Sequence, residues 1–186
     1  MIAGDAVDAG GWLAAVRREP SPNRDARPAG EAPTLLVVHA ISLPPDAFGS
    51  DDILDLFANR LRVERHPYFA GLRDLRVSAH FLIRRDGELI QFVSCDERAW
   101  HAGVSCWRGR ERCNDFSIGV ELEGCDARPF EDVQYVRLRE LADVLRRHYP
   151  LAEIVGHSDI APGRKTDPGP CFDWTRLASL PLRMPR

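Results

Sequence analysis

Apolar residues recur along the chain in runs that predict the strands of one sheet. Residues 34–41, Thr-Leu-Leu-Val-Val-His-Ala-Ile, are apolar on both alternating faces, which is typical of a central strand covered by helices on either side. Residues 77–85 and 88–93 flank Asp86-Gly87, a dipeptide that favours a tight hairpin turn. Further strands are predicted over residues 116–123 and 154–155.

A helical period marks the longest segment between these strands. Apolar side chains at 133, 136, 138, 141, 144, 145 and 149 predict an amphipathic helix over residues 132–149. Shorter helices are predicted over residues 51–61 and 173–180. Because strands and helices mix around a hairpin, we predict an α/β fold with a mixed central sheet and helices on both faces.

Three segments show no clear period and are predicted to be irregular. Four prolines interrupt residues 1–33, which we expect to form an irregular lead-in. Residues 95–115 are rich in charge and tryptophan, and residues 157–171 are rich in glycine and proline. Long loops of this kind in a compact domain are often functional.

The composition is that of an ordinary globular protein, and it narrows the class of function. The 186 residues are 44% apolar and 28% charged, which suits one compact domain over residues 1–186. A net charge of −3 argues against a nucleic-acid-binding protein. No run approaches the roughly 18–20 apolar residues of a membrane span. We therefore expect neither nucleic acid nor a membrane as a partner.

The five cysteines and the N-terminal sequence bear on the compartment. The count is odd and no two cysteines form a C-x-x-C pair, which argues against a disulfide scaffold and a four-cysteine zinc site. Free thiols in a reducing cytoplasm are the simpler interpretation. Residues 1–25 carry Asp5 and Asp8 and no apolar core of a secretory signal, so we expect a cytoplasmic protein.

Two of the six histidines share a context that suits a metal site. His39 and His157 each end an apolar strand and enter a turn-rich loop. A mononuclear catalytic zinc site takes about three protein ligands and keeps an open position for water. Either Asp159 or Asp167 could supply the third ligand, and the spacing does not choose between them. The competing interpretation is that both histidines are hydrogen-bonded structural residues.

The strand over residues 117–123 carries two acids on one face. Ile118, Val120 and Leu122 face one way, while Ser117, Gly119, Glu121 and Glu123 face the other. Two carboxylates beside a glycine suit a cleft wall that holds a general base, and they equally suit a solvated sheet face.

Lys165 is the only lysine among 25 lysine and arginine residues, and it lies between His157 and Asp167. An ammonium group is a compact point charge on a flexible stem, which the planar fork of arginine does not imitate. A cation directed at a developing oxyanion is one reason to require it. Chance placement is the alternative.

Six segments together resemble a known enzyme family. They are VVHAISLPP, HPYFA, LRVSAHFLIRRDGELIQFV, RAWHAGVS, GRERCNDFSIGVELEG and GHSDIAPGRKTDPGPCFDW. In sequence and order they resemble the cytoplasmic 1,6-anhydro-N-acetylmuramyl-L-alanine amidases of Gram-negative bacteria (the AmpD type of N-acetylmuramoyl-L-alanine amidase family 2). The resemblance spans about residues 11–174. It implies zinc-dependent hydrolysis of the amide bond between the lactyl group of 1,6-anhydro-N-acetylmuramic acid and L-alanine of muropeptides, in peptidoglycan recycling.

The resemblance also implies roles for individual residues. His39, His157 and Asp167 match the zinc ligands of the family, so Asp167 is preferred to Asp159. Glu121 matches the catalytic base and Lys165 the group that stabilises the transition state.

Three further residues lie in family motifs near the substrate cleft, and the resemblance implies that they bind substrate: Arg76, Trp100 and Arg112. The family usually has asparagine after the first zinc ligand, where this chain has Ala40. That departure puts one polar substrate contact in doubt and leaves the metal site untouched.

Other functions compete with this interpretation. An exported amidase acting on intact cell wall would need a signal segment. A non-catalytic peptidoglycan-binding module could use the same cleft, but it would have no need of the base. A cysteine hydrolase is disfavoured because no cysteine has an evident histidine partner. No obligate protein partner is implied.

Overall fold

A six-stranded mixed sheet organises the chain. The computed structural model describes residues 7–14 and 16–184. The strand order is β1 (Arg17–Arg18), β5 (Leu89–Gln91), β4 (Phe81–Ile83), β9 (Ser117–Glu123), β3 (Leu35–Ile41) and β10 (Glu153–Gly156). Strands β4, β9, β3 and β10 are mutually parallel, and β5 runs antiparallel to β4. The predicted central strand and the hairpin at Asp86-Gly87 are confirmed.

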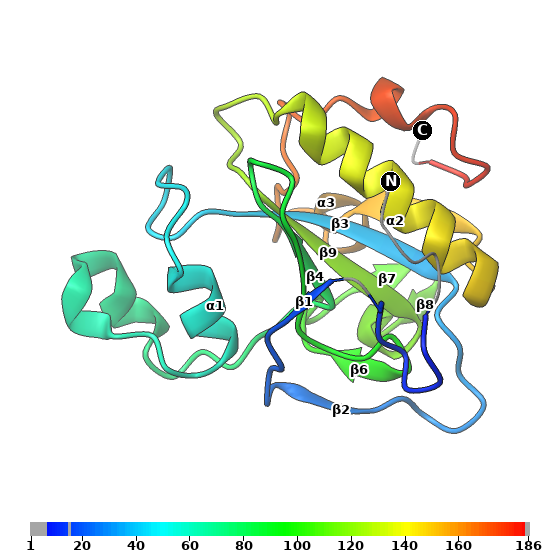
Figure 1. Ribbon diagram of the computed structural model, residues 1–186, viewed down its shortest axis with the longest axis horizontal. Coiled ribbons are helices and arrows are strands. Elements are labelled where there is room, and N and C mark those ends of the chain that lie inside the picture. Colours follow the sequence, from blue (N-terminus) through cyan, green and yellow to red (C-terminus); the bar gives the residue numbers. More distant parts are fainter. Residues whose placement is uncertain (1–6, 15, 185–186) are drawn as a thin grey trace.

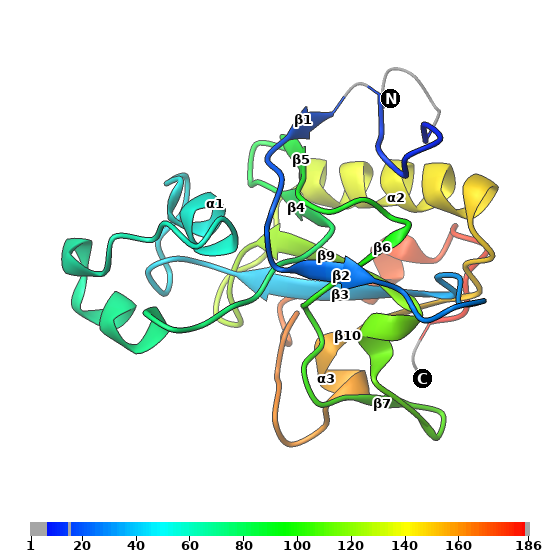
Figure 2. The same ribbon diagram turned by 90° about the horizontal axis from the view of Figure 1, so that it is seen from below.

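Helices cover both faces of this sheet, as predicted (Figures 1 and 2). The 17-residue helix α2 (Asp132–His148) packs on the face formed by Leu36, Val38, Ile118 and Val120. The opposite face carries α3 (His157–Ile160) and the small β7–β8 hairpin (Cys106–Trp107 and Arg110–Glu111). Helix α1 (Asp52–Phe57) packs against β4 and β5 through a second apolar cluster.

The alternation along β9 is the pattern that the sequence predicts. Ile118, Val120 and Leu122 are buried on the α2 side. The remaining positions, Ser117, Gly119, Glu121 and Glu123, face the other way, so one surface of this central strand is free to carry polar groups.

Several predicted boundaries are wrong. Strands β4 and β5 are shorter than the predicted strands over 77–85 and 88–93. Helix α1 ends at Phe57 rather than residue 61, because Asn59 adopts a left-handed backbone with φ of 58°. The predicted helix over 173–180 is a 3-10 turn, η4 (Trp174–Leu177).

Segments predicted to be irregular contain short pairings. The lead-in provides β1 and β2 (Arg24–Ala26), and β2 pairs with β6 (Glu97–Ala99) from the predicted loop over 95–115. That loop also holds β7, β8 and the 3-10 turn η3 (Cys113–Asp115). Residues 1–6 and 15 of the lead-in lie outside the described residues. Two or three residues are too few to show a hydrophobic period, which is why the sequence pattern misses these strands.

Two 3-10 turns, η1 (Val63–Arg65) and η2 (Pro67–Leu72), follow α1 and extend beyond the sheet (Figure 1). Among the described residues, no helix has the length and apolar character needed to cross a bilayer.

Candidate active site

The parallel strands bring three candidate residues to one edge of the sheet. His39 of β3 lies directly opposite Glu121 of β9 in the strand register. Gly156, the last residue of β10, pairs with Val38 of β3, so His157 begins α3 beside them. Ligands of open α/β sheets bind outside the carboxyl ends of the strands, and this edge is such a place.

Three ligand atoms converge there. Nδ1 of His39 lies 3.0 Å from Nδ1 of His157, and Oδ2 of Asp167 lies 3.2 Å and 3.1 Å from the same two nitrogens. The loop after α3 brings Asp167 back because the backbone N–H of Ser158 donates to its carbonyl oxygen at 2.9 Å. Among the described residues this is the one group of at least three possible metal ligands.

Asp159, the other acid that the spacing allowed, has a different role. Its Oδ2 accepts a 2.7 Å hydrogen bond from the backbone N–H of Gly156 and so satisfies a donor at the start of α3. It is not part of the convergent group.

The donor set fits a zinc ion in both spacing and protonation. Ligand atoms about 2.0–2.1 Å from zinc at tetrahedral angles lie roughly 3.3 Å apart, close to the distances found here. Nε2 of His157 lies 3.3 Å from the carbonyl oxygen of Ala102, an acceptor for the ring proton when Nδ1 binds a metal. Burial lowers the pKa of His39 to about 4, which keeps this ring in the neutral form that binds metals.

Glu121 has the features of a general base. Its Oε2 is buried and has no hydrogen-bond partner among the described residues. Burial raises the pKa of Glu121 well above its usual range; the charge of Asp167 adds to the rise and that of Lys165 opposes it. A desolvated carboxylate without a partner is costly to keep and is ready to accept a proton.

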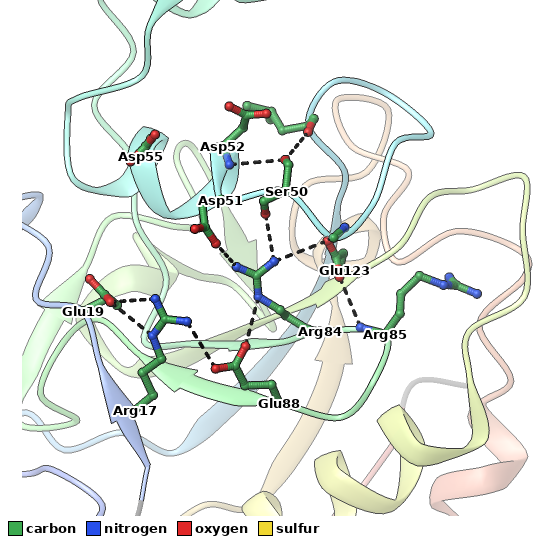
Figure 3. Close-up of polar contacts among 12 residues, drawn as sticks. Arg17, Glu19, Ser50, Asp51, Asp52, Asp55, Arg84, Arg85, Glu88 and Glu123 are labelled. Atoms are coloured by element: carbon green, nitrogen blue, oxygen red, sulfur yellow. Dashed lines mark hydrogen bonds and ion pairs between the residues drawn. The ribbon is translucent and has the colours of Figure 1, made fainter.

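Glu123, which shares the face of Glu121, is instead a structural anchor (Figure 3). Its two carboxylate oxygens accept hydrogen bonds from the backbone N–H groups of Gly49 at 2.6 Å and Arg85 at 3.2 Å. The guanidinium of Arg84 lies 4.0 Å away. Through its two backbone hydrogen bonds the carboxylate holds the loop after β3 to the β4–β5 turn.

A cavity of about 820 Å³ opens over this group of residues. One wall is largely apolar: Leu56, Phe57, Tyr68, Leu72, Leu75 and Trp100. Arg76 and the exposed Lys165 also line it, as does Ala40, which offers no polar side chain. Arg112 is not among the lining residues; it lies in a neighbouring hollow, where it pairs with Asp115 at 3.2 Å.

Sequence reasoning missed polar groups immediately behind the ligands. Nδ1 of His101 lies 2.9 Å from Nε2 of His39, and Ser117 lies behind His101. The loop that carries His101 shows no hydrophobic period from which its position could be predicted. The one sequence signal for a side chain packed at this place was Gly119, whose missing side chain leaves space for the His101 ring on that face of β9.

Comparisons with known proteins identify the family of the chain. A family described as N-acetylmuramoyl-L-alanine amidase matches residues 29–170. The 1,6-anhydro-N-acetylmuramyl-L-alanine amidase AmpD of Citrobacter freundii is 58% identical over 172 residues, which are 91% of this chain and 92% of that protein. The chain belongs to the N-acetylmuramoyl-L-alanine amidase family.

Solved structures extend the likeness to the fold of this amidase. A crystal structure of a selenomethionine derivative of AmpD matches it with a TM-score of 0.90 and 57% identity, over 93% of this chain and 97% of that one. AmiD of Escherichia coli, solved with its substrate anhydro-N-acetylmuramic acid-L-Ala-D-gamma-Glu-L-Lys, matches with a TM-score of 0.59 and 33% identity. That match covers 92% of this chain and 64% of AmiD. The resemblance found in the sequence motifs is therefore confirmed.

Proposed function

We propose that this amidase hydrolyses the amide bond between the lactyl group of 1,6-anhydro-N-acetylmuramic acid and L-alanine in muropeptides, during peptidoglycan recycling. We further propose that it uses one zinc ion per chain and forms one catalytic domain over residues 1–186. One observation carries the proposal: a convergent His-His-Asp ligand set shares a cavity with a buried, unpartnered carboxylate oxygen.

In this proposal His39, His157 and Asp167 hold the zinc. When bound there, zinc supplies Lewis-acid chemistry: it polarises the scissile carbonyl and lowers the pKa of water from about 15.7 to near 7. The two buried imidazoles and the carboxylate would together supply no more than one negative charge to a divalent ion.

The protons are handled by Glu121. Its Oε2 accepts a proton from the attacking water and then gives it to the departing nitrogen of alanine, which leaves as a neutral amine. A buried carboxyl with a raised pKa suits both halves of this transfer, because it holds the proton between the two steps. Lys165, at the rim of the same cavity, places a positive charge beside the developing oxyanion.

The cavity suits an amphipathic sugar-peptide. Its apolar wall, with Trp100, can cover a sugar ring, and Arg76 can pair with a carboxylate of the stem peptide. We propose substrate contacts for both. The proposed contact of Arg112 needs a substrate that reaches beyond the cavity into the neighbouring hollow.

Zinc dependence gives the direct test. Purified protein is expected to hold about one zinc per chain, measured by atomic emission, and a chelator should abolish muropeptide cleavage until zinc is restored. His39→Ala, His157→Ala and Asp167→Ala should each lower the zinc content, whereas Asp159→Asn should not. Full cleavage by a demonstrably zinc-free preparation would contradict the mechanism, and zinc binding without cleavage would favour a binding module.

We also propose that the enzyme works in the cytoplasm. All five cysteines are unpaired in the structure, and two of them, Cys95 and Cys113, are buried. Titration of the unfolded protein, prepared without reductant, should therefore detect all five as thiols. A reproducible disulfide between any two would instead favour the exported amidase.

A further inference from the structure

A row of buried hydrogen bonds runs from the first ligand histidine to the backbone. Nε2 of His39 lies 2.9 Å from Nδ1 of His101, and Nε2 of His101 lies 3.1 Å from Oγ of Ser117. Oγ of Ser117 donates to the carbonyl oxygen of Cys113 at 2.6 Å. His39, His101 and Ser117 are buried, with exposed fractions of 1%, 8% and 0%. Water therefore competes little for these hydrogen bonds.

The carbonyl acceptor at the far end of the row favours one direction for its protons. A carbonyl oxygen can only accept, so the single hydroxyl proton of Ser117 points to Cys113. The hydroxyl oxygen must then accept from Nε2–H of His101. The ring partners of His101 are a hydroxyl and an imidazole, and a buried ring with such neutral partners stays neutral. Its Nδ1 is therefore bare and accepts from Nε2–H of His39.

This direction leaves Nδ1 of His39 without a proton and opposes the Asp167 carboxylate, 3.2 Å away, which on its own would favour a proton on Nδ1. That nitrogen is the atom that faces His157 and Asp167 in the ligand group. A metal takes the imidazole lone pair, so the row holds His39 in the tautomer that can bind.

The surrounding backbone is shaped to hold His101 in place. A Cβ at Gly119 would lie 2.4 Å from Cγ of His101, so only glycine allows the ring to lie against β9. Oδ1 of Asn114 accepts from the backbone N–H groups of both His101 and Ala102, at 3.2 Å and 2.8 Å. Because the carbonyl of Ala102 faces Nε2 of His157, one anchored dipeptide orients both ligand histidines.

We propose that His101 and Ser117 are positioning residues that fix the tautomer of His39 and so prepare the metal site before the ion arrives. The proposal rests on the proposed zinc site, yet it also predicts a property of the metal-free protein. Outer partners of ligand histidines typically contribute about 10–100-fold to metal affinity.

The chain offers a closely matched pair of serine variants. Ser117→Ala removes the hydroxyl that orders the row, and Ser21→Ala removes another buried hydroxyl that donates to a backbone carbonyl, that of Phe57, also at 2.6 Å. Two-bond ¹H–¹⁵N NMR spectra of the metal-free proteins at neutral pH report the tautomer of His39. Wild type and Ser21→Ala should show mainly Nε2–H, whereas Ser117→Ala should shift His39 toward the Nδ1–H tautomer that the Asp167 carboxylate favours.

Zinc affinity gives the second measurement, by competition with a fluorescent chelator. Ser117→Ala should bind zinc roughly 10-fold more weakly and His101→Leu about 10–100-fold more weakly, with wild-type affinity in Ser21→Ala. His101→Asn, whose amide oxygen can accept from His39, should recover most of the loss. If His101→Leu does not fold, the serine pair still decides.

Two results would overturn the proposal: an unchanged His39 tautomer in Ser117→Ala, or equal zinc affinities in Ser117→Ala and wild type. Failure of the zinc site itself is distinguishable, because wild-type protein would then bind no zinc whatever the NMR spectra show.

Discussion

Glu121→Gln is expected to lower kcat by roughly 10²–10⁴-fold while zinc content and fold are retained. An amide has nearly the shape of the carboxylate and cannot accept a proton, so the attacking water keeps its own. The loss should appear in kcat under saturating muropeptide, with products separated by mass spectrometry. A kcat within threefold of wild type would show that Glu121 is not the base.

Glu123→Gln is the matched control, because the two acids share one strand face and differ in environment. Glu123 accepts from two backbone N–H groups, and we expect its replacement to lower the free energy of unfolding by about 1–3 kcal/mol. The kcat of the folded fraction should stay near wild type. Equal kcat losses in both variants would mean that the choice between the two carboxylates is wrong.

The raised pKa of Glu121 also predicts how the stability of Glu121→Gln, relative to wild type, changes with pH. Its folded-state pKa lies above the unfolded value, so its contribution to stability is full below the unfolded pKa and is lost as pH rises through the folded pKa. Glutamine does not titrate. The unfolding free energy of metal-free Glu121→Gln, relative to wild type, should therefore increase as pH rises through that range.

The strong periodic signals in the sequence predicted most of the architecture. Residues 117–123 alternate because one face packs under α2, and the helix over residues 132–148 buries one stripe that includes Leu138, Leu141 and Leu145. Val133 and Val136, which the predicted stripe also included, are exposed. His39 and His157 could be paired from sequence because each follows an apolar run near the carboxyl end of a strand, and these ends of parallel strands meet at one edge. The structure corrects their places in detail: His39 lies within β3, two residues before its end, and His157 begins α3 directly after β10.

Long-range contacts decided what the sequence alone could not. Glu121 and Glu123 are alike in spacing and residue type, and only the loop at Gly49 and the turn at Arg85 distinguish them. The choice of Asp167 over Asp159 came from the resemblance; in the structure Asp167 converges with the two histidines, whereas Asp159 accepts a hydrogen bond from the backbone of Gly156.

Lys165→Arg is expected to fail as a conservative change and to lower kcat by roughly 10²–10³-fold, as is Lys165→Ala. Lys165 is exposed at the rim of the cavity, so neither variant should change stability or zinc content. KM should change little, because the oxyanion that the ammonium stabilises exists only in the transition state. Arg146→Ala, which removes an exposed cation from α2, should leave kcat unchanged and controls for net charge.

The pH profile separates the two roles of this lysine. The positive charge of Lys165 lowers the pKa of Glu121, so Lys165→Ala should move the acid limb of kcat/KM to higher pH. Lys165→Arg keeps a positive charge and should leave the limb near its wild-type position, yet its bulkier planar group cannot take the place of the ammonium at the oxyanion. For Lys165→Arg we therefore expect the acid limb of kcat/KM at its wild-type pH together with a low kcat. If Lys165→Arg keeps more than about a third of wild-type kcat, the lost stabilisation is less than about 1 kcal/mol, and the lysine acts only as a general positive charge.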